Sequence, residues 1–86
     1  MSTLSIETDN TQTISVMKVT GRVDSETAPD LDMALSKLLN ENRNKIVLNL
    51  QGVDFLSSAG LRAMVKALKG AQKSGGDVRL AAVSQP

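Results

Sequence analysis

The sequence has no cysteine and no histidine. Disulfide bonds are therefore impossible, and the thiolate and imidazole ligands on which most zinc sites depend are missing. Without histidine, the chain also lacks the commonest general acid–base group and any Ser-His-Asp triad. Tryptophan and tyrosine are absent too, and Phe55 is the single aromatic residue. Because bases stack on aromatic side chains, this composition argues against single-stranded nucleic-acid binding.

The chain also lacks a strong excess of charge and a long apolar run. A net charge of +1 over 86 residues gives no general attraction to nucleic acid or to membranes. No apolar run approaches the roughly 18 residues of a membrane span, and the N-terminus has no secretory signal pattern. With 41% hydrophobic residues, the composition predicts a single domain over residues 1–86, with an aliphatic core and a cytoplasmic location.

The first half of the sequence predicts a hairpin followed by a helix. Alternating apolar and polar residues over Leu4–Thr8 and β-type residues over Gln12–Thr20 predict two antiparallel strands, and Gly21 is expected to end the second. Ser25 or Thr27 then caps a helix. That helix carries one apolar stripe, formed by Leu31, Ala34, Leu35, Leu38 and Leu39.

The second half predicts a strand, a helix and a strand. A nearly continuous apolar run over Lys45–Leu50 is typical of a central parallel strand with both faces covered. Leu61–Lys73 predicts a helix, and Val78–Val83 predicts a last strand. The stripe expected to be buried in this helix is Leu61, Met64, Val65 and Leu68. The order ββαβαβ predicts an α/β fold, with one open, mostly parallel four-stranded sheet and two helices on one face.

Two adjacent serines, Ser57 and Ser58, stand where the central strand gives way to the second helix. Backbone N–H groups point outward at a helix start, and the helix dipole favours negative charge there. Serine is also a leading helix cap. The turn therefore predicts either a cap or a serine that accepts a phosphate and thereby changes which partner docks.

Charged residues near this turn offer further candidates. Asp54 either belongs to a docking surface or is a solvated loop carboxylate. Four basic residues lie on one face of the second helix with no acidic residue between them, and they are Arg62, Lys66, Lys69 and Lys73. Such a row is more often a solvated face, and contact with an acidic partner surface is the alternative.

Three segments form a recognisable pattern. They are Thr20-Gly21-Arg22-Val23-Asp24, Ile46-Val47-Leu48-Asn49-Leu50 and Phe55-Leu56-Ser57-Ser58-Ala59-Gly60-Leu61. This pattern resembles the STAS domains, and within them the bacterial anti-sigma factor antagonists, over about Leu4 to Val83. In that family the last turn usually reads Asp-Ser-(Ser/Thr)-Gly-Leu, and an anti-sigma factor that is also a kinase phosphorylates the serine after the aspartate.

The resemblance implies a protein switch rather than an enzyme. When Gly60-Leu61 is aligned with the Gly-Leu of the family turn, Ser58 takes the position of the phosphate acceptor. Ser57 is then left as the cap. The unmodified chain would bind an anti-sigma factor with serine kinase activity, and the sigma factor would be freed. Phosphorylation of the chain would prevent this binding, and a serine phosphatase would restore the unmodified chain. The implied partner-binding residues are Asp24, Thr27, Asp54, Ser57, Ala59, Gly60 and Arg62. Asp24 matches an acidic position beside the acceptor, and a turn aspartate that bonds nearby backbone is an equally good interpretation. No metal, cofactor, membrane or direct nucleic-acid contact is implied.

The sequence departs from the family pattern in the turn and in length. Ser57 stands where aspartate is usual and Ala59 replaces the second hydroxyl, so the turn does not identify the kinase. Family members usually continue into at least one more helix over the sheet. Its absence here predicts a truncated or minimal domain whose apolar surface near Val78, Leu80 and Val83 favours self-association.

The main alternative is a non-switching STAS module that scaffolds a larger signalling assembly or binds a ligand. A phosphocarrier of sugar transport needs a histidine, which this chain lacks. An acyl carrier protein is all-helical, whereas this sequence has strand signals. Gly60 and Gly70 are not part of a P-loop, because no Gly-Lys-Ser/Thr follows a glycine-rich turn.

Overall fold

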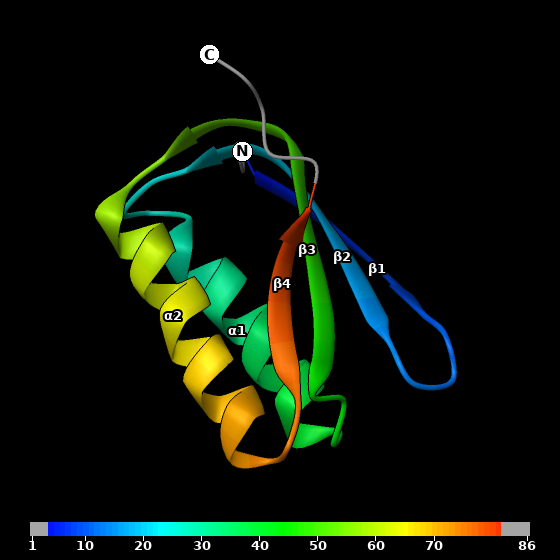
Figure 1. The fold of residues 1–86 in the computed structure, drawn as a ribbon. Helices are drawn as coiled ribbons and strands as arrows, with labels where there is room; N and C mark the ends of the chain where they lie inside the picture. The colour runs from blue at the N-terminus through cyan, green and yellow to red at the C-terminus, as the bar shows by residue number, and fades with distance from the viewer. Residues whose placement is uncertain (1–3, 82–86) are drawn as a thin grey trace.

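The computed structural model describes residues 4–81, which form one sheet with both helices on the same face (Figure 1). The elements in chain order are β1 (Leu4–Asn10), β2 (Ser15–Val23), α1 (Ala28–Asn40), β3 (Lys45–Leu56), α2 (Ser58–Lys73) and β4 (Asp77–Ala81). The strand order is β1-β2-β3-β4, with β1 antiparallel to β2 and with β3 parallel to both of its neighbours. The predicted ββαβαβ order and α/β fold are therefore confirmed, and the sheet is mixed. Neither helix within residues 4–81 is long and apolar enough to cross a membrane.

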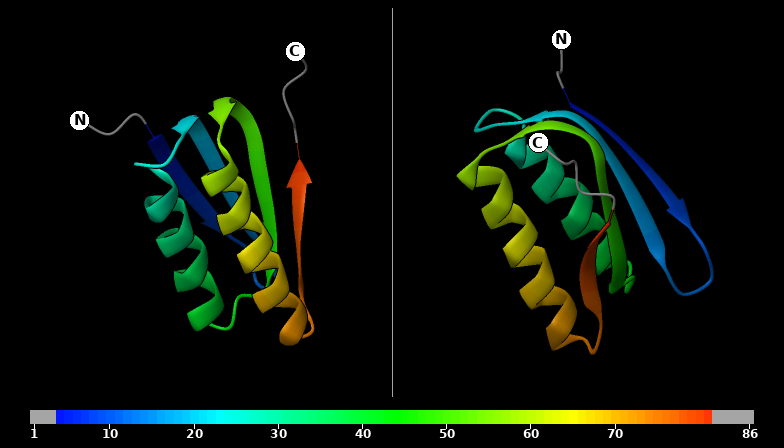
Figure 2. Two further views of the ribbon diagram at one scale, coloured as in Figure 1. Left: turned by 90° about the vertical axis from the view of Figure 1, so that its left-hand side faces the viewer. Right: turned by 45° about the horizontal axis from the view of Figure 1, so that its top comes forward.

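The two helices lie side by side because each connects a pair of neighbouring parallel strands (Figure 2). Both crossovers step in the same direction across the sheet, from β2 to β3 and from β3 to β4, so both helices cover the same face. The core fills the space between the sheet and the helices. Its buried members are Met17, Val19, Val23, Ala28, Leu31, Leu35, Leu38, Ile46, Leu48, Leu50, Met64 and Ala67.

The central strand β3 is buried on one face only. Ile46, Leu48 and Leu50 point toward the helices and are buried. Val47 and Asn49 point to the other face and are half-buried. The prediction that both faces are covered is wrong for the described residues, because both helices pack on the same side. The continuous apolar run reflects a strand between two neighbours rather than one between two helix layers.

The inward face of α2 is built mainly from small residues, which the sequence pattern did not predict. Its buried residues are Gly60, Ala63, Met64, Ala67 and Ala71. Of the predicted stripe only Met64 is buried, whereas Leu61 is 50% exposed and Val65 is 42% exposed. Small side chains let α2 approach the sheet and α1 closely, since the separation of packed elements depends on the side chains between them. The larger apolar residues are therefore turned outward.

The ends of β2 and β3 extend beyond the predicted strands. The prediction that Gly21 ends β2 is wrong, because β2 continues to Val23 with Gly21 at a φ of 105° that glycine adopts without strain. β3 likewise continues to Leu56, and its pairing with β2 passes over Asp54 as an extra residue. Such β-bulges bend a strand, and both strand ends curve over the starts of the helices (Figure 1).

The outer ends of the sheet differ from the sequence predictions in their boundaries. β1 runs to Asn10, so the hairpin turn lies later than predicted. That turn is closed by Thr11, whose N–H donates to the Ile14 carbonyl at 2.8 Å and whose side-chain oxygen accepts from the Ile14 N–H at 3.1 Å. At the other end β4 stops at Ala81, and the predicted strand end at Val83 lies outside the described residues.

Candidate functional site

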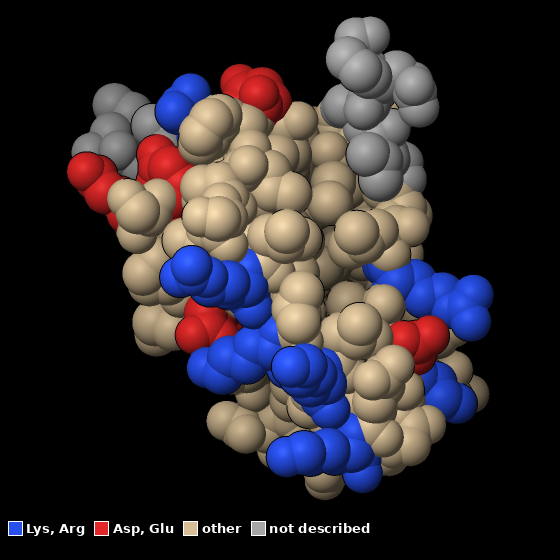
Figure 3. Space-filling view, turned by 60° about the vertical axis from the view of Figure 1, so that its left-hand side comes forward, with Lys and Arg blue, Asp and Glu red and all other residues tan. Residues whose placement is uncertain are grey.

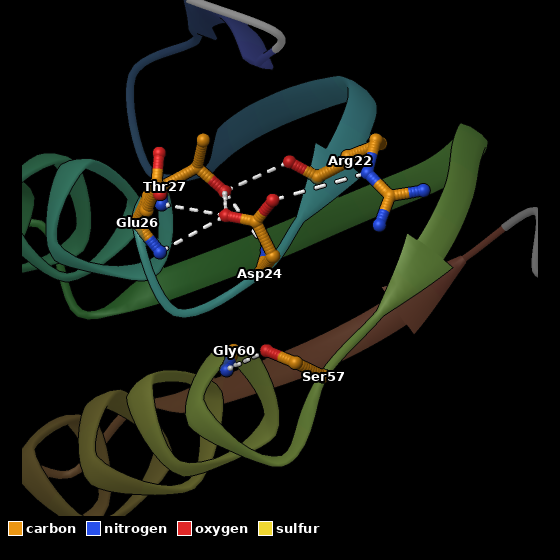
Figure 4. Close-up of polar contacts among 6 residues, drawn as sticks. All are labelled: Arg22, Asp24, Glu26, Thr27, Ser57 and Gly60. Carbon is orange, nitrogen blue, oxygen red and sulfur yellow. Dashed lines mark hydrogen bonds and ion pairs between the residues drawn. The ribbon is translucent and has the colours of Figure 1, made fainter.

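Two turns meet where β2 and β3 end. The last residues of these parallel strands, Val23 and Leu56, are paired, so the Asp24 turn and the Ser57 turn begin side by side (Figure 4). The Ser57 N–H donates to the Val23 carbonyl at 2.8 Å and ties the second turn to the first. The carboxyl ends of parallel strands are where open α/β sheets usually place their functional groups.

Ser57 is the N-cap of α2. Its side-chain oxygen accepts a hydrogen bond from the Gly60 N–H at 3.2 Å, and its carbonyl accepts one from the Leu61 N–H at 3.0 Å. An extended backbone at Ser57 (φ −84°, ψ 169°) suits this geometry. The prediction that Ser57 caps the helix is confirmed, and its hydroxyl is engaged in holding the first turn.

Ser58 has the opposite environment from its neighbour. It is the first residue of α2 and is exposed. Within residues 4–81 its hydroxyl has no hydrogen-bond partner. The first turn of α2 contains no acidic residue, so a negative group added there would meet the positive end of the helix dipole without a like charge in the same turn. Of the two serines, Ser58 is the one free to be modified.

Gly60 allows α2 to start this close to the sheet. It is buried, and a Cβ atom on it would lie 2.9 Å from Leu56 Cδ1 and closer still to Val23 Cγ1. A side chain at this position would push the helix start away from the paired strand ends. Gly60 therefore shapes the site from inside.

The Asp24 turn is held by its own carboxylate. Asp24 Oδ1 accepts from the N–H groups of Glu26 and Thr27, each at 3.0 Å, and Thr27 Oγ1 accepts from the Asp24 N–H at 2.9 Å (Figure 4). The Thr27 hydroxyl lies 2.8 Å from the Arg22 carbonyl oxygen. The hydrogen bonds to the Asp24 carboxylate, the one from the Thr27 amide first, lower the pKa of Asp24 below its ordinary value of 3.8, and desolvation opposes this shift. Thr27 stands at the N-cap position of α1, but its side chain does not cap the helix.

Arg22 and Phe55 form a further pair that sequence reasoning did not select. The Arg22 guanidinium carbon lies 4.4 Å from the centre of the Phe55 ring, within cation–π range. Arg22 Nε also lies 3.8 Å from Asp24 Oδ2. A signal was available, since both residues fall in the segments of the family pattern. Their proximity depends on the bulged register of β2 and β3, which the sequence did not reveal.

The predicted partner-binding residues fall into exposed and interior groups. Asp54 and Arg62 are exposed, Asp24, Ser57 and Ala59 are half-buried, and Thr27 and Gly60 are buried. Ser58 and Arg62 line one surface hollow along α2, and Arg62 and Ala59 line a smaller one beside α1. In the described part of the chain, no hydrogen bond or ion pair joins the Asp54 side chain to another of these residues. The paired strand ends thus bring together the turns that contain Asp24, Thr27, Ser57 and Gly60. Ser58, Ala59 and Arg62 follow along the first turns of α2, and Asp54 lies on the bulge of β3.

The fold and this site define an α/β domain that displays a serine hydroxyl at a helix start, beside a turn held by a carboxylate. The chain belongs to the STAS domain family, whose model matches residues 5–86.

Relatives and solved structures of this family agree with that assignment. The chain is 30% identical over 81 residues to an anti-sigma-B factor antagonist of Staphylococcus aureus, covering 94% of this chain and 75% of the relative. It resembles the crystal structure of an anti-sigma factor antagonist from Mycobacterium paratuberculosis with a TM-score of 0.80 and 26% identity, over 90% of this chain and 65% of that one.

The fold is shared with a more distant protein as well. The anti-sigma factor antagonist SpoIIAA in its unphosphorylated form matches with a TM-score of 0.81 and 16% identity, over 94% of this chain and 76% of that one. The phosphorylated form of the Bacillus protein SpoIIAA matches with a TM-score of 0.74 and 14% identity, over 86% of this chain and 68% of that one.

Proposed function

We propose that this chain is an anti-sigma factor antagonist whose binding is switched by phosphorylation of Ser58. In its unmodified form it binds an anti-sigma factor that is also a serine kinase, and sigma factor is released. Phosphorylated Ser58 prevents this binding, and a serine phosphatase restores it. The relative in Staphylococcus aureus, named an anti-sigma-B factor antagonist, supports the choice of partner.

The observation that carries the proposal is the contrast between the two serines. The Ser57 hydroxyl accepts the Gly60 amide proton at 3.2 Å, whereas Ser58 is exposed at the first position of α2. A kinase needs a hydroxyl that it can reach and that is not already part of the helix cap. Ser58 meets that requirement.

Phosphorylation at this position changes the surface more than the fold. A phosphoserine adds about −1.5 to −2 charges at pH 7. At the start of a helix such a charge stabilises the folded state by about 0.3–1 kcal/mol. Against a partner surface that carries like charge or excludes water, the same dianion costs several kcal/mol, and each 1.4 kcal/mol weakens binding about tenfold. One phosphate is therefore enough to dissociate a working complex.

The proposed contact surface surrounds Ser58. Arg62, Ala59 and Asp24 are accessible to a partner, and Asp54 extends the surface along β3. Thr27 and Gly60 are buried and would act indirectly, by holding the Asp24 turn and the start of α2 in place. The chain itself is a substrate of the kinase rather than an enzyme, because nucleotide, metal and catalytic base would all belong to the kinase. We place this system in the cytoplasm, where sigma factors act.

The test is phosphorylation by the anti-sigma factor kinase encoded in the same genome. After incubation with ATP and that kinase, the intact mass of the wild-type chain and of Ser57→Ala should rise by one phosphate, and that of Ser58→Ala should not. A phosphate on Ser58→Ala would disprove the assigned acceptor. A wild-type chain that binds the kinase but is never phosphorylated would favour the non-switching scaffold instead.

Within residues 4–81 β4 is an edge strand, and this supports a second association. Leu80 is 50% exposed, and Val78 on the same strand is half-buried against the core. An edge strand with an exposed apolar residue is a ready site for pairing with another chain. We include self-association through β4 in the proposal.

A further inference from the structure

The outward surface of α2 carries a row of positive charge (Figure 3). The row, here called the basic row, is Arg62, Lys66, Lys69 and Lys73, and all four residues are exposed. α2 contains no acidic residue that would offset this charge. Within residues 4–81 the row forms a single ion pair, from Lys66 Nζ to Asp32 Oδ2 of α1 at 3.2 Å.

An apolar hollow runs beside the basic row. The hollow has a volume of about 770 Å³ and is lined by Leu61 and Val65 of α2 and by Leu39 of α1, together with all four residues of the row. Leu61 and Val65 are 50% and 42% exposed. Ser58 lines the hollow as well. The surface therefore combines partly exposed apolar side chains with cations and includes the serine proposed as the switch.

The geometry points to this surface as the docking site for an acidic, amphipathic helix of the anti-sigma factor. Apolar side chains of that helix enter the hollow, and its carboxylates lie along the basic row. From Arg62 to Lys73 the row is roughly 16 Å long, at 1.5 Å per helical residue, which is the length of about three helical turns. The inference rests on the proposed function and adds the chemistry of the partner to it.

An acidic partner also gives the switch its physical cause. Because Ser58 lines the same hollow, a phosphate on it would place negative charge beside the partner's carboxylates. Like charges brought together in a contact cost several kcal/mol, so binding is lost without any change in the fold. A basic partner surface would attract the phosphate instead.

The test reverses charges on the row and compares them with a matched reversal elsewhere. Lys69→Glu and Lys73→Glu are combined in one variant, because neither lysine has an ion-pair partner within the described residues. Lys18→Glu and Lys37→Glu are combined as the control, since both lysines are exposed, neither has an ion-pair partner within the described residues, and both lie outside the hollow. Urea unfolding of all variants checks that the fold is retained.

Binding to the anti-sigma factor is measured by surface plasmon resonance at low and at high salt. We expect the double reversal to weaken binding about tenfold at low salt, mainly through slower association, and the gap to narrow as salt rises. The control variant with Lys18→Glu and Lys37→Glu should bind like the wild type. Ser58→Asp is measured alongside as the readout of the switch.

The outcomes separate the two claims. If Ser58→Asp loses binding but the double reversal does not, the switch stands and the acidic docking helix is overturned. If only the double reversal loses binding, the docking surface stands and the switch fails. If no variant, nor the wild type, binds the anti-sigma factor, both are overturned. Binding of duplex DNA or phosphatidylserine vesicles that depends on the row, with the protein complex unaffected, also overturns the inference.

Discussion

At the scale of single residues, two neighbouring hydroxyls have different roles because their surroundings differ. The Ser57 side-chain oxygen accepts a hydrogen bond from the Gly60 amide and caps the helix. Ser58, one position later, is exposed. From their position alone, either serine could be a helix cap or a phosphate acceptor. The family pattern assigned the cap to Ser57 and the acceptor to Ser58. The structure adds the hydrogen bond from the Gly60 amide to Ser57, which gives the physical reason why the two serines differ.

This difference predicts unequal effects on stability when each hydroxyl is removed. Ser57→Ala should lower the free energy of unfolding by about 1 kcal/mol, because an N-cap is lost. Ser58→Ala should change it by less than about 0.5 kcal/mol, as an exposed substitution does. Urea unfolding followed by circular dichroism measures both. Equal effects on stability would mean that Ser57 is not the cap in solution.

Gly60 and Gly70 offer a matched pair on one helix. A Cβ atom on Gly60 would lie 2.9 Å from Leu56 Cδ1, whereas one on Gly70 would lie 3.1 Å from the flexible end of Leu39. Alanine improves helix propensity by about 1 kcal/mol over glycine at either position. Overpacking should outweigh that gain at Gly60 and leave Gly60→Ala about 1–3 kcal/mol less stable than Gly70→Ala. The midpoints of urea unfolding give the comparison, and a more stable Gly60→Ala would show that the helix start can move outward freely.

The Asp24 turn makes a prediction about pH. Hydrogen bonds to its carboxylate lower the pKa of Asp24 in the folded state below 3.8. The stabilisation is therefore fully present above that value and is lost as the pH falls through the lower, folded-state pKa. The stability advantage of the wild type over Asp24→Asn should shrink as the pH drops below about 3.8. The two proteins differ only at residue 24, so the difference between their unfolding curves at several acidic pH values isolates Asp24. A constant difference would mean that its pKa is not lowered.

At the scale of secondary-structure elements, α2 shows where the sequence pattern was insufficient. Counting large apolar residues at helical spacing selected Leu61 and Val65 for the core, but both are more than one-third exposed. The helix is instead oriented by Ala63, Ala67 and Ala71, which are buried. Alanine contributes little to an apolar pattern, yet it permits the closest packing. The pattern therefore identified the helix correctly and its orientation incorrectly.

The orientation of α2 can be tested with two truncations on the same helix. Met64→Ala should cost about 2–5 kcal/mol of unfolding free energy, because Met64 is only 4% exposed. Leu61→Ala should cost less than about 1 kcal/mol, because Leu61 is half exposed already. Chemical denaturation of the two variants would distinguish this orientation from the one that the sequence pattern suggested. A larger loss of stability for Leu61→Ala than for Met64→Ala would favour the orientation that the sequence pattern suggested.

The strand boundaries were the other feature of the secondary structure that the sequence did not predict correctly. The hydrophobic runs located every strand, but β2 and β3 extend past the predicted ends at Thr20 and Leu50. The extensions contain Gly21 and Gly52, which a local pattern interprets as breaks. Their pairing is decided by the neighbouring strand rather than by their own propensity. Local sequence alone therefore could not place the bulges or bring Arg22 beside Phe55.

At the scale of the whole molecule, the order of elements was sufficient to predict the fold. A hairpin followed by two strand–helix–strand units allows few sheet arrangements, and the structure has the one with both helices on one face. The same arrangement leaves β4 as an outer strand within residues 4–81. Leu80 on that strand is 50% exposed.

Self-association through β4 should therefore depend on Leu80. In sedimentation velocity the wild-type chain should sediment faster as its concentration rises, and Leu80→Lys should remain a monomer, because a charge on an edge strand opposes pairing with another chain. Met33→Lys is the control, since Met33 is 71% exposed on α1, away from β4. If Leu80→Lys self-associates as the wild type does, the contact lies elsewhere.

The extra residue at position 54 of β3 has a consequence for how this domain tolerates change in length. A bulge residue has no partner in the ladder of paired residues, and it bends the strand that carries it. Asp54, which the pairing with β2 passes over, comes just before Phe55 and Leu56. Its loss would leave Phe55 and Leu56 opposite Arg22 and Val23 but would remove the bend that brings the strand end over the start of α2. The number of residues in this stretch, more than the identity of residue 54, sets the direction in which the serine faces.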